Sequence, residues 1–222
     1  DEQRQVYLYS ALFIPLRNMF CLDRKSKKIP VASYIIKDAL KLSGFLAESV
    51  NTIHTASRKF AELVLLFESD EAFGNLKEEL EDEYLSIPTD LVKRVYAGLI
   101  LDEVKDLWRV ILLISILSYP EAKSFGETLS QQEDELGRTT SRYIKIKRSI
   151  TNLDLDGVWK CKPLLTGKDI KDVMQVKACP LIGEWKKRLF KWQLAHPEAT
   201  KDDCMEWLKQ SQSKRQKVVS IS

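Results

Sequence analysis

The segment KPLLTGKDIKDVMQVKACPLIGEWKKRLFKWQ, Lys162 to Gln193, indicates most clearly how this chain folds. Thr166 and Asp169 have the spacing of a capping box, in which each side chain bonds to the backbone N–H of the other residue. They predict a short helix that ends at about Gln175. A turn follows, and Pro180 suits the first position of the next helix. The segment therefore predicts two helices joined as a hairpin.

The second helix of this hairpin has an apolar side and a basic side. Its apolar stripe recurs at helical spacing, as in a helix packed on a core: Ile182, Trp185, Leu189 and Trp192. Lys187 and Lys191 are expected to project from the opposite side, and Thr200 to Asp203 begins a final helix. Tryptophan at helical spacing is typical of a packed interior. We therefore expect Trp185 and Trp192 to be core residues.

The Thr-Gly-Lys of this segment does not form a P-loop. That motif reads G-x-x-x-x-G-K-[ST], so that backbone N–H groups surround a phosphate and the last hydroxyl reaches Mg²⁺. Counted back from Gly167 and Lys168, the first glycine position holds Lys162, and the hydroxyl position holds Asp169. The carboxylate of Asp169 would repel a nucleotide. A nucleoside triphosphate site is therefore excluded at this position.

The composition of the 222 residues favours an all-α protein. Apolar residues make up 44%, enough for a sizeable core, whereas 8 glycines and 7 prolines are few for a protein of many tight turns. Helical patterns cover 2–20, 31–42, 47–68, 88–119 with a break near Gly98, and 138–155. A linker at Gly157 divides a multi-helix body domain, 1–157, from a small helical-hairpin tail domain, 158–222. The last ten residues or so are expected to be disordered, as chain ends often are.

Several classes of protein are excluded by what the chain lacks. Its most apolar run, Val110 to Leu117, is much shorter than the roughly 20 residues of a membrane-spanning helix. No signal peptide opens the chain, and its four scattered cysteines form no C-x-x-C pair, which indicates an intracellular protein with reduced thiols. His54 and His196 have no nucleophile at a recognisable spacing, so structural roles are expected for both.

Two acidic groups have the composition of metal sites but not the context. Asp154 and Asp156 lie at a predicted helix end with no glycine-rich phosphate loop before them. Glu133 to Glu135 lies in a polar stretch and is expected to be solvated. We therefore predict no metal site in this chain.

Charge is unevenly distributed along the sequence. The segment 62–106 contains 13 acidic and 4 basic residues, whereas 142–192 contains 13 basic and 5 acidic residues. A basic half of this kind favours binding to a polyanion such as a nucleic-acid backbone. Helix starts at Gly167 and Pro180 add unpaired backbone N–H groups, where a phosphate can bind. The candidate binding residues are Arg142, Lys145, Arg148, Lys160, Lys162, Thr166, Gly167, Lys168, Lys186, Lys187 and Lys191.

Several short sequences in the chain match one known family. W-x-x-K-P-L-L-x-G-K-D-I from Trp159 to Ile170, P-L-I-G-E-W from Pro180 to Trp185 and E-W-L from Glu206 to Leu208 resemble the tail of CCA-adding tRNA nucleotidyltransferases. The opening Y-L-Y-S-A-L-F-I-P-L-R-N from Tyr7 to Asn18 is similar to the start of the body domain in class II, plant-like eukaryotic members. The resemblance extends in order over nearly the whole chain. It departs from the family at Ala178-Cys179, where many relatives have a glycine before the proline.

The resemblance implies that the catalysis lies outside this chain. In that family a head and a neck, which should precede Asp1, hold the glycine-rich loop, the D-x-D pair for Mg²⁺ and the residues that select CTP and ATP. Asp154-Leu155-Asp156 is in the wrong place for that pair, and Glu133-Asp134-x-x-x-Arg138 is one residue too long for the family's E-D-x-x-R nucleotide template. The chain alone is therefore expected to have no cofactor and no activity, and to associate with its own missing head and neck.

The resemblance also implies a partner, which is tRNA. The body is expected to lie along the acceptor stem and the tail to reach the elbow, with contacts mostly to phosphate and sugar. The expected compartments are the cytoplasm and nucleus, with mitochondrion or plastid as further sites for the full-length protein. Oligomeric state has no signal in the sequence.

Two other classes stay open at this point. A helical protein-interaction module would use the acidic surface of 62–106 as its partner site, and would expose a large apolar patch. A helix-turn-helix DNA-binding domain is least supported, because no cluster of Arg, Asn or Gln opens the second tail helix.

Overall fold

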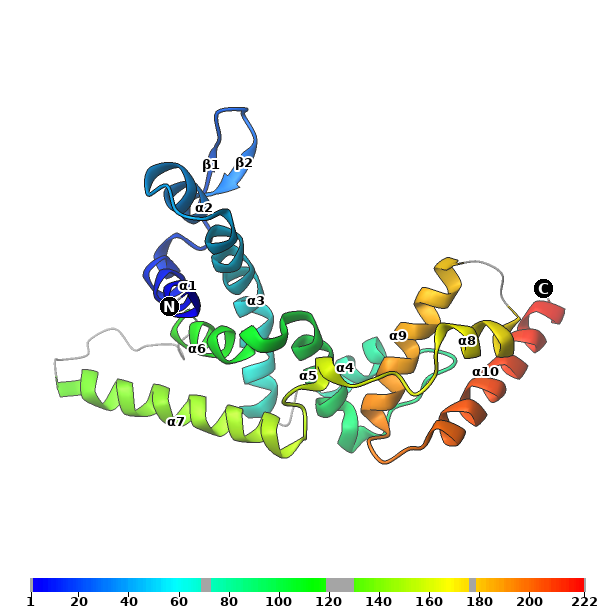
Figure 1. Ribbon diagram of the computed structural model, residues 1–222. Coiled ribbons are helices and arrows are strands. Elements are labelled where there is room, and N and C mark those ends of the chain that lie inside the picture. Colours follow the sequence, from blue (N-terminus) through cyan, green and yellow to red (C-terminus); the bar gives the residue numbers. More distant parts are fainter. Residues whose placement is uncertain (1, 69–72, 119–129, 176–178, 222) are drawn as a thin grey trace. The chain divides into compact units, whose positions relative to one another are not determined.

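The computed structural model describes residues 2–68, 73–118, 130–175 and 179–221. These residues are mostly helical, with one small two-stranded sheet, so the predicted fold class is confirmed (Figure 1). The chain forms two compact units. Unit 1 contains residues 1–68 and 104–152, and unit 2 contains 69–103 and 153–222. The sequence placed a boundary at 157/158, near the division at 152/153, but it assigned 69–103 to the first domain.

Unit 1 is built around its longest helix, α3 (Gly44–Glu68). Helices α1 (Glu2–Leu12) and α6 (Trp108–Ser118) pack on α3, and α7 (Ser130–Asn152) packs on α6. The buried side chains at their contacts recur at helical spacing: Val50, Ile53, Phe60 and Val64 of α3, and Trp108, Ile111, Leu112 and Ile114 of α6. The apolar stripe that predicted α3 is therefore the core of this unit.

A β-hairpin projects from unit 1 between the helical patterns predicted over 2–20 and 31–42 (Figure 1). Strands β1 (Phe20–Leu22) and β2 (Lys28–Pro30) pair antiparallel, with Phe20 opposite Pro30 and Leu22 opposite Lys28. Helix α2 (Val31–Tyr34) follows directly and continues as the π-helical turn η2 (Ile35–Ala39), so the helix predicted over 31–42 is shorter. Strands of three residues are too short for a period of two to appear in the sequence.

The long helix predicted over 88–119 is divided, but not at Gly98. The turn η3 (Thr89–Leu91) leads into α5 (Val92–Val104), and α6 follows after the turn η4 (Lys105–Leu107). The break falls at Lys105, whose φ of 51° is left-handed. Gly98 lies inside α5 instead, because a Cβ atom at this position would stand 2.6 Å from Cδ2 of Leu194. The glycine therefore serves close packing between two segments of unit 2.

Unit 2 contains the predicted helical hairpin and an aromatic core. Helices α8 (Gly167–Met174) and α9 (Cys179–Ala195) pack on one another, and α10 (Lys201–Ile221) packs on α8. Trp185 and Trp192 are buried, as predicted. Their ring centroids lie 6.2 and 5.5 Å from that of Trp207 on α10. α10 extends to Ile221, and the expected disorder of about the last ten residues stays a prediction.

The remaining elements of unit 2 are short. Helix α4 (Phe73–Leu80) precedes a tight loop closed by an isolated bridge between Asp82 and Leu85, and the turn η5 (Val158–Lys160) precedes α8. The turn predicted over Val176 to Cys179 lies mostly outside the described residues. Unit 2 therefore combines most of the acidic segment 62–106, its residues 69–103, with the basic C-terminal helices.

Candidate nucleic-acid interface

The start of α8 is closed by the predicted capping box. Oδ2 of Asp169 accepts bonds of 2.7 Å from the backbone N–H and the hydroxyl of Thr166, and Oγ1 of Thr166 accepts the Asp169 N–H at 3.2 Å. The hydrogen bond from the Thr166 hydroxyl lowers the pKa of the Asp169 carboxyl. The polar groups of Thr166 are therefore committed to the cap, so its hydroxyl is not poised for a phosphate. The N–H groups of Gly167 and Lys168 have no acceptor within the helix, because they belong to its first turn.

Lysines from other helices gather at this helix start. A Cβ atom on Gly167 would lie 3.2 Å from Cε and 3.4 Å from Nζ of Lys186, so the Lys186 ammonium on α9 lies directly beside the first residue of α8. Lys168 and Lys201 both act electrostatically on Asp169. Lys201 was missed in the sequence analysis. It follows Thr200, whose capping box with Asp203 begins α10. We call Lys168, Lys186, Lys187 and Lys201 the lysine cluster of unit 2.

A groove of about 320 Å³ opens beside this cluster. Its lining is mainly apolar, with polar groups at the α8 start: Cys161, Pro163, Leu165, Thr166, Gly167, Lys186, Leu189, Phe190 and Gln193. The side-chain amide of Gln193 accepts the Leu164 N–H at 3.2 Å and donates to the Lys162 carbonyl at 3.4 Å. The segment that carries Lys160 and Lys162 is thereby fixed against α9, with both lysine side chains exposed.

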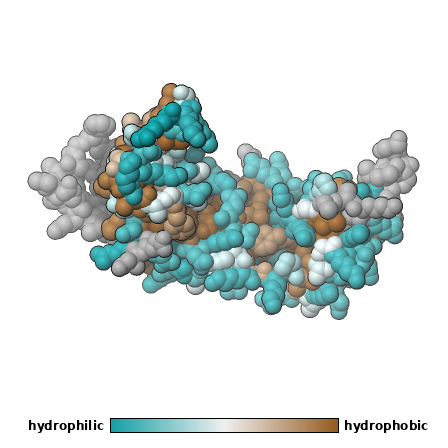
Figure 2. Space-filling model, turned by 45° about the horizontal axis from the view of Figure 1, so that its top comes forward, coloured by the Kyte–Doolittle hydropathy of each residue, from teal (hydrophilic) through white to brown (hydrophobic). Residues whose placement is uncertain are grey.

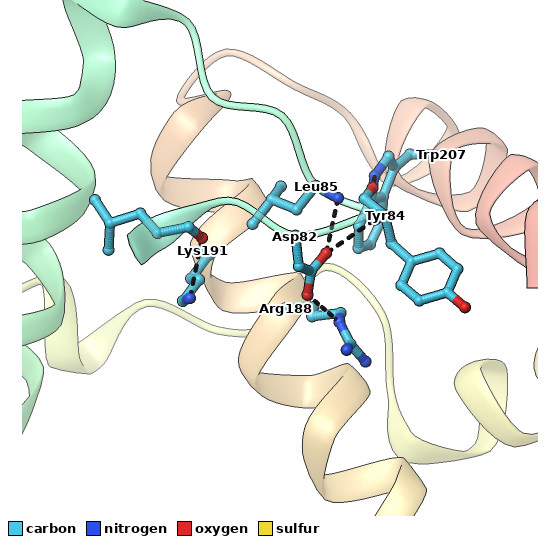
Figure 3. A network of polar contacts seen from close by, with 7 residues as sticks. Asp82, Tyr84, Leu85, Arg188, Lys191 and Trp207 are labelled. Atoms are coloured by element: carbon cyan, nitrogen blue, oxygen red, sulfur yellow. Dashed lines mark hydrogen bonds and ion pairs between the residues drawn. The ribbon is translucent and has the colours of Figure 1, made fainter. Parts of the chain in front are cut away.

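Two cations of α9 are used inside unit 2 rather than presented to a ligand. Lys191 was predicted to project outward with Lys187, but its Nζ donates to the carbonyl of Leu80 at 3.1 Å (Figure 3). The guanidinium of Arg188 bonds to Oδ2 of Asp82 at 2.5 Å and lies over the Trp185 ring. Lys187 and Lys186 are exposed. The exposed cations of α9 are therefore Lys186 and Lys187, near the middle of the helix.

The loop that follows α4 is held in place by Asp82, the carboxylate that binds Arg188. Oδ1 of Asp82 accepts the N–H groups of Tyr84 and Leu85 at 2.9 and 3.0 Å. Nε1 of Trp207 donates to the Tyr84 carbonyl at 3.1 Å (Figure 3). Burial raises the pKa of Asp82, but the bond from Arg188 and those backbone N–H groups outweigh it, so the pKa lies below its ordinary value of 3.8. Asp82 of the acidic segment 62–106 therefore neutralises Arg188 of the basic segment 142–192.

The replacement Asp82→Asn tests this pairing. We expect it to lower the free energy of unfolding at neutral pH by about 1–2 kcal/mol, because Asp82 is partly exposed and its ion pair is screened by solvent. A carboxyl whose pKa is depressed by folding stabilises the fold above its unfolded pKa, and that stability is lost as the pH falls below about 4. Urea unfolding from pH 7 down to pH 3 should therefore show a weaker acid dependence in Asp82→Asn. The exposed Asp172→Asn is the control, and identical pH profiles for wild type and Asp82→Asn would contradict the pairing.

The predicted residues of α7 lie in unit 1, so the candidate set is divided between the two units. The Arg142 guanidinium forms a two-pronged ion pair with Glu68 of α3, with N–O distances of 2.6 and 2.8 Å. Lys145 and Arg148 are exposed on the same helix. Arg142 therefore has a structural role in joining α7 to α3, and a binding role for Lys145 and Arg148 stays a prediction.

The other polar residues weighed in the sequence have structural surroundings. Nε2 of His54 donates to the Ser10 carbonyl at 2.8 Å in the core of unit 1, and burial lowers the pKa of this histidine. His196 stacks on Trp192 at 4.4 Å between ring centroids. Asp154 and Asp156 are exposed, whereas the side chains of Glu133 to Glu135 lie outside the described residues.

No three His, Cys, Asp or Glu side chains come close enough to hold a metal ion within the part of the chain that the structure describes. Among the described helices, none is long and apolar enough to cross a membrane.

Comparison with known proteins gives two relatives for this helical chain of two units, both of them tRNA nucleotidyltransferases. "tRNA nucleotidyltransferase cca2" of Schizosaccharomyces pombe is 27% identical over 208 residues, which cover 94% of this chain. "CCA tRNA nucleotidyltransferase, mitochondrial" of Candida glabrata is 21% identical over 210 residues, or 93% of this chain. No family model and no solved structure matches.

These comparisons confirm the resemblance found in the sequence. The similarity extends over nearly all of the chain, as the scattered short matches indicated. The chain spans only about a third of the length of these relatives, 36% and 35% respectively. It is therefore similar to one part of a longer nucleotidyltransferase.

Proposed function

We propose that this chain is the tRNA-binding C-terminal part of a CCA tRNA nucleotidyltransferase. The similarity over 94% and 93% of the chain to two enzymes named as tRNA nucleotidyltransferases carries the proposal. The exposed lysines of unit 2 supply the chemistry, because a protein that accepts every tRNA must bind phosphate and sugar rather than read bases. The binding residues in unit 2 are Lys160, Lys162, Gly167, Lys168, Lys186, Lys187 and, as an addition, Lys201. Lys145 and Arg148 contribute from unit 1.

In this proposal the reaction belongs to the rest of the full-length protein. A catalytic head would bind Mg²⁺ with CTP or ATP and transfer the nucleotide to the 3′ end of tRNA. This chain would hold the tRNA in position, in contact with the head and neck, and would have no activity alone. One relative is named as mitochondrial, which supports a mitochondrial location among the compartments predicted.

The protein-interaction alternative is less well supported by the contacts. It would use the acidic surface over 62–106, in which Glu68 is already paired with Arg142 and Asp82 with Arg188. Both carboxylates join segments of the same unit. An interaction module would also fail to retain tRNA at physiological salt.

The test is to measure binding and turnover with the purified 222-residue chain. Binding to tRNA should weaken steeply as salt rises, with a slope of about −0.7 to −0.9 per phosphate contact in a plot of log affinity against log salt. tRNA should compete better than a single-stranded RNA of equal length. With tRNA that lacks its 3′ CCA, Mg²⁺, CTP and ATP, no nucleotide should be added.

Two outcomes would overturn the proposal. Failure to retain tRNA at physiological salt would remove the binding function. Incorporation of CMP or AMP by this chain alone would show that catalysis does not need the missing part. Addition of the corresponding head and neck, as a separate chain or in the full-length protein, should restore incorporation.

A further inference from the structure

The β-hairpin of unit 1 carries a concentration of positive charge outside the sites described so far. Arg24, Lys25, Lys27 and Lys28 lie within five residues, and all four side chains are exposed. None of them forms an ion pair with a carboxylate in the described part of the chain. Cations at this density attract a polyanion, because no carboxylate forms an ion pair with them in the part of the chain that the structure describes.

The loop is held in one conformation by Asp23, which is the nearest acid. Its Oδ1 accepts the N–H groups of Lys25 and Lys27 at 2.8 and 2.9 Å, and its own N–H donates to the Lys27 carbonyl at 2.9 Å. Ser26 takes the left-handed conformation that closes the turn, with φ of 58°. The Asp23 carboxylate is thus engaged with the backbone, and the four cations project from a fixed turn.

Apolar side chains lie beside this charge rather than at the tip. Phe20 and Leu22 alternate with Cys21 on β1, so they point to the same face of the strand. Their side chains are 53% and 67% exposed, and Nζ of Lys28 lies 4.7 Å from the centroid of the Phe20 ring. Figure 2 shows hydrophilic and hydrophobic surface side by side in this unit. The hairpin therefore combines cations with an exposed aromatic face.

We propose that this hairpin is a separate RNA-binding element, with its loop cations on phosphates and the Phe20 and Leu22 face against a base or ribose. The proposal rests on the proposed function and adds a surface that the sequence analysis did not assign. RNA offers both chemistries in one chain, since each nucleotide has an anionic phosphate and a flat base that stacks on aromatic rings.

The order of residues argues against an anionic membrane as the partner. A hairpin that enters a bilayer needs apolar side chains at its tip, whereas here Arg24, Lys25 and Lys27 form the tip and the apolar residues lie behind it. Insertion would carry three charges into the hydrocarbon before Phe20 could reach it, which is costly. The phosphates of RNA lie on its outside, so they meet the tip first.

The experiment uses the full chain with Arg24→Gln, Lys25→Gln and Lys27→Gln combined. We expect tRNA affinity to fall by about tenfold or more, and the salt slope to fall by about 2–3, because each of the three lost phosphate contacts removes about 0.7–0.9. The matched control combines Arg4→Gln, Arg58→Gln and Lys209→Gln, three exposed positions with the same loss of charge. That control should retain the slope.

A second variant tests the apolar face without changing charge. Phe20→Ala should weaken binding severalfold at constant salt slope, and Phe20→Trp should restore it, because stacking depends on an aromatic ring. Phe20 is exposed, so circular dichroism and the melting temperature of both variants should stay at the wild-type values.

The outcomes separate this inference from the proposed function. If wild type binds tRNA and the hairpin variants bind equally well, the hairpin inference is overturned and the proposed function stands. If wild type binds no tRNA, both the hairpin inference and the proposed function fail. Binding of wild type to phosphatidylserine vesicles, lost in the triple variant while tRNA binding is unchanged, would assign the hairpin to a membrane and overturn the inference.

Discussion

Replacement of Trp185 by alanine is expected to destabilise unit 2 by about 3–5 kcal/mol, the usual range for a buried tryptophan. Trp185 is 2% exposed, and its ring contacts those of Tyr84 and Trp207, with centroids 5.1 and 6.2 Å away. It also lies beneath the Arg188 guanidinium, whose carbon is 4.9 Å from the ring centroid. Its removal leaves a cavity where three segments of the chain meet.

The measurement combines urea unfolding by far-ultraviolet circular dichroism with hydrogen exchange resolved by peptide. Amides of α9 and α10 should lose protection in Trp185→Ala, whereas those of α3 in unit 1 should change little. Trp185→Phe should recover part of the loss, since it keeps a ring. Phe45→Ala, at a position 60% exposed, is the control and should change stability by less than about 0.5 kcal/mol. Unchanged protection of α9 in Trp185→Ala would contradict the aromatic core.

Charge reversal in the lysine cluster should produce the largest change in RNA affinity. With Lys168→Glu, Lys186→Glu and Lys187→Glu combined, we expect tRNA affinity to fall by about 100-fold or more at 150 mM salt. Each substitution removes a phosphate contact and adds a repulsive charge, so the salt slope should fall by about 2–3. The three side chains are exposed, so the fold should be retained.

The matched control reverses the same amount of charge elsewhere in unit 2. Lys171→Glu, Lys209→Glu and Lys214→Glu are exposed positions outside the cluster. Their combination should weaken binding much less. Equal losses in the two triple variants would show that only net charge matters, and would contradict a localised site.

Lys191→Gln should reduce stability more than affinity, because Lys191 bonds to the Leu80 carbonyl.

Local sequence patterns predicted the helical hairpin of unit 2 well. The Thr166 and Asp169 capping box, the buried positions of Trp185 and Trp192, and the helical stripe of α3 all appear in the structure as expected. These features depend on neighbours within four residues or on a period of 3.6, and a sequence displays both directly. The helix break predicted near Gly98 was wrong. In sequence, a glycine that allows close packing looks the same as a glycine that ends a helix.

The sequence by itself determined the mostly helical fold, the helix caps, the apolar stripes and the similarity to tRNA nucleotidyltransferases. Only the tertiary structure decided which cations stay exposed. Arg188 and Lys191 are bound by residues 106 and 111 positions away, and Lys186 reaches the start of a different helix. A charge pattern shows only which charged residues are close along the sequence, whereas an ion pair depends on the distance between two side chains in space. The basic segment 142–192 therefore presents fewer exposed cations than its sequence suggests, because Arg188 pairs with Asp82 and Lys191 bonds to the Leu80 carbonyl.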